Sequence, residues 1–364
     1  SVIEIVSYSS PALLSPQQTQ QSFWTAAMES NGLFPLLNIN RYDIHGKEVL
    51  DSDAVITAVQ QNPQAAAVKY IFTHDYGLHS YPLHHIFTLG AGMNVVEAIY
   101  NSFPPAIEEM CEEETVLHLA VKFRSSLDII HFIFNKWPGA AHRKNQVGQT
   151  PLHIACSNGA PVEVVSLLLN SWPDASKEKS VDGRTPFHEA CICKSSFDVM
   201  PLLLSRWPGV VKEKCNMGNT PLHWVCMHGQ LEKIHFVLNN WPGAVREKNA
   251  FGELPLHSAC ETNQTKEVIL MLLEHWPEAV REKSNFGKSP LDGFSHFGSS
   301  EVVATVLSHV SKLCGEVVDK TTSREIIAYF LEIKWYRGVG LLLDRLPSAF
   351  KQLNIDNMTL PDFL

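Results

Sequence analysis

Apolar residues recur at helical spacing in several stretches of this chain, and polar, glycine-containing stretches separate them. The clearest apolar stretches are residues 162–169, 199–204 and 266–273, and each predicts an outer helix. A shorter segment of small and apolar residues precedes each one, and a polar segment such as residues 177–183 follows the first. The pattern therefore predicts a unit of turn, short helix and longer helix that repeats along the chain.

A tetrapeptide marks the start of each predicted short helix. Thr-Pro-Leu-His or Thr-Pro-Phe-His begins at Thr150, Thr185 and Thr220, with 35 residues between successive copies. Threonine is a good N-cap, and proline suits the first helical position because the N–H that it lacks would have no partner there. Weaker copies begin at Tyr81, Thr115, Leu254, Ser289 and Thr359.

Two further columns keep the same register. Trp-Pro follows the predicted outer helices, and proline ends a helix because it pushes the preceding residue out of the α region. A glycine stands two residues before the threonine column, as a hairpin-like turn would require. The tryptophans are Trp137, Trp172, Trp207, Trp241 and Trp276, and the glycines are Gly148, Gly183, Gly218, Gly252 and Gly287. We interpret the tryptophans as a packing ladder between outer helices.

This repeat resembles the ankyrin repeat, over roughly residues 51–364. It departs from the family in its length of 35 residues, in Trp-Pro at the end of the outer helix, and in degenerate copies at 51–80 and 311–350. The resemblance implies an all-α, ankyrin-like helical solenoid with short hairpin turns and about eight to nine repeats. It also implies a concave, partner-binding face made of hairpin tips and inner helices.

The ends of the chain differ from its middle. Residues 1–50 are expected to form an N-terminal arm and a partly ordered lead-in, with a flexible arm at residues 9–22. Residues 51–70 predict the outer helix of a worn first repeat, followed by an insertion within residues 70–79. The first residue is not Met, so the chain is expected to be a processed or excerpted piece.

Composition narrows the class of protein. The net charge of −9 argues against a general nucleic-acid binder. Eight scattered cysteines in a chain of this size favour reduced thiols, hence the cytoplasm or the nucleus. No apolar run reaches the roughly 18–20 residues that span a bilayer, so no membrane insertion is expected. We expect a monomer.

Histidine and cysteine recur three residues apart, which raises the question of zinc. Zinc needs about four ligands, whereas equivalent pairs in stacked repeats would lie roughly 8–10 Å apart. The resemblance implies instead that His binds backbone near the turns and that Cys fills an alanine-sized core slot. Because the histidines are periodic, they indicate architecture, and we predict no catalytic site, metal, cofactor or small-molecule substrate. The pairs are His153/Cys156, His188/Cys191, His223/Cys226 and His257/Cys260.

The hairpin arms carry alternating charges in one register. The copies are Lys177–Lys179, Lys212–Lys214, Arg246–Lys248 and Arg281–Lys283, each with a central Glu. One interpretation is a solvated surface with cross-repeat Lys–Glu pairs, each contributing roughly 0–1 kcal/mol. The other is an electrostatically polarised docking face.

The resemblance implies that turn tips and inner-helix ends face a protein partner. Turn tips usually avoid large apolar groups, so Met217, Phe251 and Phe286 on successive tips predict an apolar strip if they are exposed. Alternatively, each Phe folds back onto the next repeat's turn. The other candidates are Arg184, Glu253 and Lys288 beside the threonine column, Trp224 after the repeat histidine, and Met227, His228 and Phe297 at inner-helix ends.

The sequence thus predicts a non-catalytic scaffold that binds a protein partner on the concave face. One alternative is the targeting array of a longer enzyme or signalling protein. Another is an anionic partner bound through the Lys/Arg ladder, and steep salt dependence would mark it.

Overall fold

The computed structural model describes residues 32–39, 50–72, 79–111, 113–193, 197–294, 300–315 and 318–345. The chain forms two compact units, Ser1–Gln146 and Val147–Leu364, which we take one at a time. The expected arm at residues 9–22, the candidate Phe297 and the partial repeat from Thr359 lie outside the described residues.

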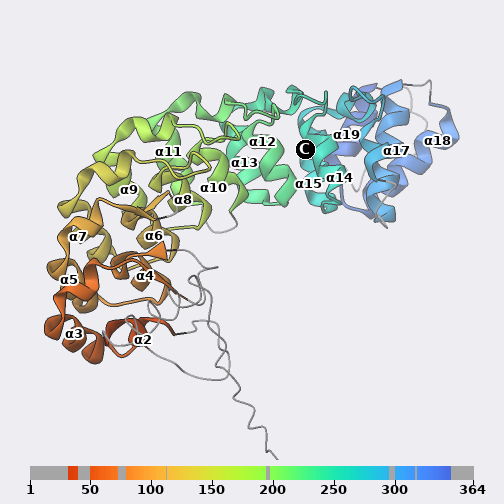
Figure 1. The fold of residues 1–364 in the computed structure, drawn as a ribbon. Coiled ribbons are helices and arrows are strands. Elements are labelled where there is room, and N and C mark those ends of the chain that lie inside the picture. Colours follow the sequence, from red (N-terminus) through yellow and green to blue (C-terminus); the bar gives the residue numbers. More distant parts are fainter. Residues whose placement is uncertain are drawn as a thin grey trace, which may run out of the picture. The chain divides into compact units, whose positions relative to one another are not determined.

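The first unit contains helix pairs and two short hairpins (Figure 1). Its elements are α2 (Leu33–Leu37), α3 (Ser52–Gln61), η1 (Pro63–Ala67), β1 (Tyr70–Ile71), β2 (His79–Ser80), α4 (Pro82–Thr88), α5 (Met93–Ser102), η2 (Pro104–Ile107), β3 (Met110–Cys111), β4 (Glu114–Thr115), α6 (Val116–Lys122), α7 (Leu127–Lys136) and η3 (Pro138–His142). Helix α3 and the 3₁₀ helix η1 confirm the outer helix predicted for residues 51–70.

The hairpins of the first unit are antiparallel. Strand β1 pairs with β2, with Tyr70 opposite Ser80, and residues 73–78 of the predicted insertion lie outside the described residues. Strand β3 pairs with β4, with Met110 opposite Thr115. Helix α2 was not expected: Leu33 and Leu37 are buried, and the carbonyl of Leu37 lies 3.1 Å from Nε2 of His85.

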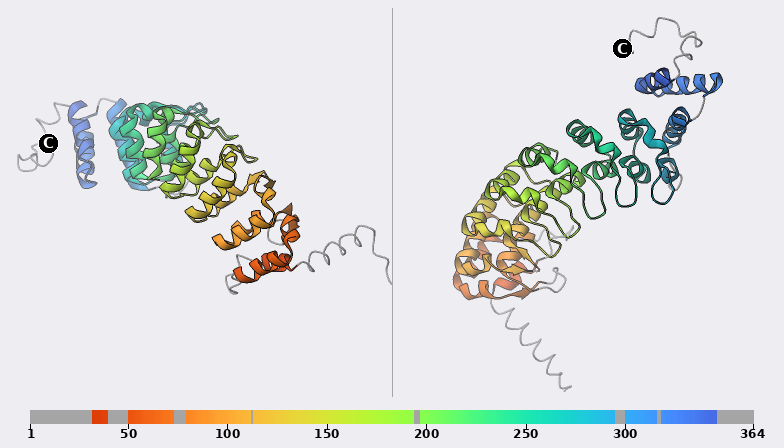
Figure 2. Two further views of the ribbon diagram at one scale, coloured as in Figure 1. Left: turned by 90° about the vertical axis from the view of Figure 1, so that its left-hand side faces the viewer. Right: turned by 90° about the horizontal axis from the view of Figure 1, so that it is seen from above.

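The second unit stacks helix pairs in two rows (Figures 1 and 2). The inner helices α8, α10, α12, α14 and α16 contact one another in turn, and the outer helices pack behind them. The elements are α8 (Pro151–Ser157), α9 (Val162–Ser171), η4 (Pro173–Lys177), α10 (Pro186–Ile192), α11 (Val199–Arg206), η5 (Pro208–Lys212), α12 (Pro221–His228), α13 (Leu231–Asn240), η6 (Pro242–Arg246), α14 (Pro255–Glu261), α15 (Lys266–His275), η7 (Pro277–Arg281), α16 (Pro290–Phe294), α17 (Glu301–Gly315), α18 (Lys320–Glu332) and α19 (Tyr336–Arg345).

Local signals in the sequence account for the helix ends. Thr150, Thr185 and Thr220 are the N-caps of α8, α10 and α12, with proline at the first turn of each helix. The outer helix α13 ends at the residue before Trp241, its C-cap, and Pro242 then opens the 3₁₀ helix η6. The proline thus ends one helix, as predicted, and begins a second, short one that the sequence did not reveal.

The core lies between the two rows of helices. The apolar column of the tetrapeptide is buried, as are the paired Ala-Cys positions and the apolar faces of the outer helices. At the C-terminal side, the Trp335 indole before α19 donates to a carboxylate oxygen of Glu274 in α15 at 3.2 Å. The degenerate copy is therefore helical and attached to the regular repeats.

Candidate protein-binding face

In the regular repeats, the tetrapeptide histidine caps the N-terminus of its own inner helix. In α8 the amide of Thr150 donates to Nδ1 of His153 at 3.2 Å, and the threonine Oγ1 lies 2.9 Å from the same nitrogen. Leu254 replaces the threonine before α14, yet its amide still donates to Nδ1 of His257 at 3.1 Å. Because Nδ1 accepts, the proton of each neutral ring sits on Nε2.

The Nε2–H of these histidines reaches the next repeat. His153 donates to the carbonyl of Arg184 at 3.1 Å, His223 to that of Glu253 at 3.1 Å, and His257 to that of Lys288 at 3.2 Å. Three candidate binding residues, Arg184, Glu253 and Lys288, therefore have their backbone held by the preceding repeat.

Burial keeps these rings neutral. It lowers the pKa of His223 to about 4 and that of His188 to about 3. In the first unit, burial lowers the pKa of His84 to about 4, and its Nε2 lies 3.1 Å from the carbonyl of Glu109. Desolvation is the largest cause in each case, because a charged imidazolium loses its hydration on burial.

The recurring His–Cys pairs are not arranged for zinc. Both ring nitrogens of His153 are engaged in hydrogen bonds, and Cys156 is fully buried. Burial raises the pKa of the Cys156 and Cys226 thiols, which disfavours the thiolate that a metal requires. Within the described part of the chain, no group of three or more His, Cys, Asp or Glu side chains could hold a metal ion.

The hairpin tips of the second unit are joined from repeat to repeat by backbone hydrogen bonds. Val181 N donates to Val147 O at 2.9 Å, Ala250 N to Met217 O at 3.0 Å, and Asn285 N to Phe251 O at 2.9 Å. The tips therefore form a ladder whose backbone is ordered before any partner arrives.

Large apolar side chains project from these joined tips. Met217 is 45% exposed, Phe251 42% and Phe286 68%, and the two phenylalanine rings stack at 6.4 Å between centroids. Val147 and Val181, on the two preceding tips, are 49% and 66% exposed. These five side chains form what we call the tip strip.

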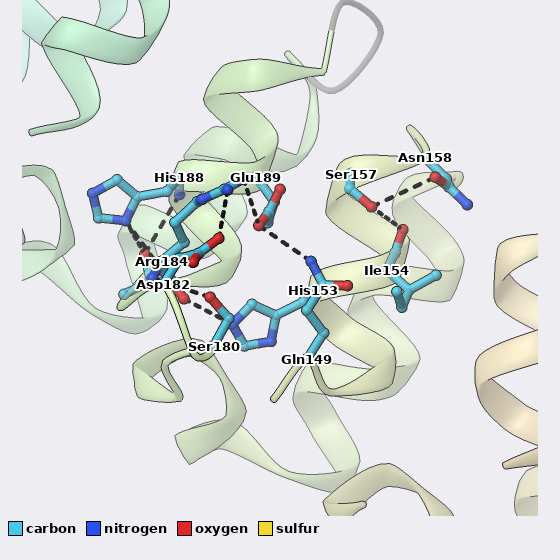
Figure 3. A network of polar contacts seen from close by, with 11 residues as sticks. Gln149, His153, Ile154, Ser157, Asn158, Ser180, Asp182, Arg184, His188 and Glu189 are labelled. Atoms are coloured by element: carbon cyan, nitrogen blue, oxygen red, sulfur yellow. Dashed lines mark hydrogen bonds and ion pairs between the residues drawn. The ribbon is translucent and has the colours of Figure 1, made fainter. Parts of the chain in front are cut away.

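A polar network joins residues of the turns before α8 and α10 to Glu189 in α10 (Figure 3). The Gln149 side-chain amide donates to Glu189 Oε1 at 3.3 Å, and Arg184 Nη1 lies 3.6 Å from the same oxygen. Arg184 Nη2 also donates to Asp182 at 2.7 Å, and its guanidinium lies over the Trp224 ring at 5.2 Å. Burial raises the pKa of Glu189, which is only 4% exposed.

The remaining candidates occupy the same face with different exposure. Trp224 and Met227 in α12 are half-buried, whereas His228 at the end of this helix is exposed. Lys288 is exposed, and Glu253 accepts from the side-chain amide of Asn249 at 2.9 Å. Arg184 and Trp224 are brought together by the stack, although they are 40 residues apart in the sequence.

The charged ladder of the hairpin arms forms cross-repeat ion pairs. Lys179 pairs with Glu213 at 2.8 Å, Lys214 with Glu247 at 2.8 Å, and Lys248 with Glu282 at 2.9 Å. All six side chains are between 29% and 44% exposed, so each pair contributes only about 0–1 kcal/mol. Each of these three lysines therefore has a carboxylate partner in the next repeat.

The tryptophan column is half-buried and contacts basic side chains. Arg246 lies over the Trp276 ring at 4.8 Å, and Lys212 lies over the Trp241 ring at 6.0 Å. Each of these cations comes from the preceding repeat, so the column links successive repeats through cation–π contacts.

Two members of this face were missed by sequence reasoning. Val181 lies one position before the tip column, where that repeat carries Asp182, so a column-by-column comparison passes over it. Glu189 stands in the column after the repeat histidine, and an isolated Glu on an inner helix gives no sign that the preceding repeat supplies Gln149 and that its own turn supplies Arg184. Glu189 is the one carboxylate in this column, so a search for carboxylates on the inner helices by column would have found it.

Comparison with known proteins gives one family. A model of ankyrin repeats matches this chain in three overlapping stretches, residues 117–214, 152–244 and 207–284. No curated protein matches the chain. Among the helices of the described residues, none is long and apolar enough to cross a membrane.

Proposed function

Residues 117–284 of this chain are ankyrin repeats, and from that premise we propose that the protein is a non-catalytic scaffold that binds a protein partner through the tip strip. Ankyrin repeats are generally protein-interaction modules and typically lack catalytic activity. The partner would present apolar side chains to Met217, Phe251 and Phe286, with polar groups facing the network around Arg184.

The observation that carries this proposal is the exposure of large apolar side chains on five consecutive tips, from Val147 to Phe286. A contiguous apolar surface in water commonly marks a protein interface, and the stacked rings of Phe251 and Phe286 make two neighbouring tips contiguous. The two phenylalanines are of the aromatic type that often dominates binding energy. The ladder of backbone bonds supports the same conclusion, because a pre-ordered surface loses little conformational freedom on binding.

The exposure of Phe286 argues against the alternative in which each phenylalanine folds back onto the next repeat's turn. Phe251 packs beside Phe286, but it keeps 42% of its surface open, and Phe286 keeps 68%. A side chain with that much contact to water contributes little to the core, so its removal should change binding far more than folding.

The test combines affinity capture and mass spectrometry, with the whole chain as bait, and a triple variant. Met217→Ala, Phe251→Ala and Phe286→Ala together should weaken binding of the captured partner by at least about 2 kcal/mol, or roughly 30-fold. The melting temperature should stay nearly unchanged. The matched control is Val302→Ala with Leu331→Ala, two exposed apolar residues away from the tips, which should bind as the wild type does. If stability falls while the folded fraction still binds normally, the strip is not the binding site.

A further inference from the structure

Lys233 is a lysine in a buried valine column. Eight residues before each Trp-Pro or Phe-Pro pair, the outer helices carry Val95, Ile129, Val164, Val199 and Val268, all at most 3% exposed. The equivalent residue of α13 is Lys233, which is 2% exposed. Lysine is almost never buried so fully unless its ammonium finds partners.

The ammonium of Lys233 binds the end of the inner helix of the preceding repeat. Its Nζ donates to the carbonyl of Ala190 at 2.6 Å and also to the carbonyl of Cys193. Gln230, just before α13, donates its side-chain amide to the carbonyl of Ile192 at 3.4 Å. The last carbonyls of a helix lack intrahelical donors and carry partial negative charge, so a cation is favoured there.

The inner helices α8 and α14 close this end with their own backbone. Ala155 O accepts from Ala160 N at 2.9 Å in α8, and Ala259 O accepts from Gln264 N at 3.0 Å in α14. After each of these two helices the backbone turns through a left-handed residue, which is Gly159 (φ 63°) after α8 and Asn263 (φ 52°) after α14.

The repeat of α10 departs from this pattern. Its residue in the left-handed column is Lys194, which lies outside the described residues. The C-cap Cys193 has extended backbone at φ −69° and ψ 131°, whereas Asn158, the C-cap of α8, is helical at φ −93° and ψ 0°. The outer helix α11 is also shorter than its neighbours, with 8 residues instead of 10.

We propose that Lys233, supplied by the next repeat, is the C-terminal cap of α10, and so a positioning residue for the polar network. Glu189, which holds Gln149 and Arg184, directly precedes the capped residue Ala190 in α10. The position of Glu189 on the binding face therefore depends on a contact made behind it, by α13. This inference concerns α10 itself and holds whether or not the tip strip binds a partner.

The test replaces Lys233 with its column residue and then restores the glycine of the left-handed position. In Lys233→Val, amide exchange in the last turn of α10 should become at least about tenfold faster, while the last turns of α8 and α14 keep their rates. Adding Lys194→Gly should return α10 to within about threefold of the wild type, because glycine can supply the backbone cap. Lys233→Met, alone and with Lys194→Gly, replaces Lys233→Val if that variant does not fold.

A second measurement follows the network. In protein labelled with 5-fluorotryptophan, the Trp224 resonance is assigned through Trp224→Phe. Lys233→Val should shift that resonance, because Glu189 and Arg184 move with α10, and Lys194→Gly should reverse the shift. The proposal is overturned if Lys233→Val leaves amide exchange in α10 unchanged, or if Lys194→Gly does not slow that exchange again. It is also overturned if the Trp224 resonance does not shift in Lys233→Val.

Discussion

At the scale of single residues, the repeat histidine serves two neighbours at once. In His153, His223 and His257, Nδ1 accepts the N-cap amide of its own helix and Nε2 donates to a carbonyl of the next repeat. Both bonds need a neutral ring with one defined tautomer. A protonated ring would lose its acceptor at Nδ1 and would place a charge in the core, so the fold depends on the protonation state of these residues.

This dependence predicts acid sensitivity. Burial lowers the pKa of His223 to about 4, so between that value and the ordinary pKa of about 6.5 the unfolded chain binds more protons than the folded one. Stability should therefore fall as pH falls through this window. Between pH 7 and pH 5 the loss should be about 1–2 kcal/mol for each such histidine. Urea unfolding at several pH values measures it.

The variant His223→Gln isolates the effect. It should be less stable than the wild type at pH 7, and the difference should shrink toward pH 5 because the variant lacks this titrating group. His235→Gln removes an exposed histidine of α13 and serves as the control for a histidine-to-glutamine change outside the core. If the stability of His223→Gln falls with pH as steeply as that of the wild type, the His223 ring does not cause the acid sensitivity.

At the scale of elements, the hairpin is the joint between repeats. Each turn contains a glycine with positive φ, and at Gly218 an added Cβ would lie only 2.6 Å from the amide nitrogen of Ala250 in the next turn. That amide belongs to the ladder bond from Ala250 to Met217. The glycine is therefore required for two reasons, the backbone conformation and the close approach of the next repeat.

A matched pair of substitutions separates these reasons. Gly218 and Gly287 share φ of 74°, but an added Cβ at Gly287 meets nothing within 4 Å. Gly287→Ala should lose roughly 1–2 kcal/mol for the left-handed conformation alone. Gly218→Ala should lose at least about 1 kcal/mol more, since backbone atoms of the next turn must move. Chemical denaturation of both variants measures the difference in the free energy of unfolding. Equal losses of stability would show that the next turn moves away from the added Cβ at no cost.

At the scale of the whole molecule, the described contacts run mostly between neighbouring repeats, so stability should be roughly a sum of local terms. Within the second unit, the inner helices of residues 150–260 begin with well-formed N-caps. The helices α18 and α19 are attached to the regular repeats by contacts such as those of Trp335 and the exposed Arg337 with Glu274. The two ends of this unit therefore need not open together.

Hydrogen exchange should reveal this order. We expect the strongest protection in residues 150–260 and the earliest opening in the stretch 311–335, before any loss of protection in α8 or α12. The same molecule supplies its own control, because all amides are followed in one experiment. Uniform protection from residue 150 through the C-terminal helices would contradict the prediction and would indicate a single cooperative unit.

The sequence by itself determined the repeat, the helix starts and stops, and the buried columns. These follow from local rules: threonine and proline at Thr150–Pro151 begin a helix, proline after Trp241 ends one, and apolar residues at helical spacing pack inward. It also named the residues of the tip strip from Met217 to Phe286, because the tips share a position in every repeat.

Only the tertiary structure decided which of these residues meet. The sequence allowed Phe251 to be either buried or exposed, because its exposure depends on how the neighbouring turn packs against it. Arg184 lies over Trp224, 40 residues away, and Lys233 reaches Ala190, 43 residues away. Such contacts depend on how one repeat packs against the next. The periodicity of the sequence gives the spacing of residues along the chain, but it does not give the distances between repeats in space. That is why the fold was predictable from the sequence, whereas the polar network and the cap from α13 became visible only in the stack.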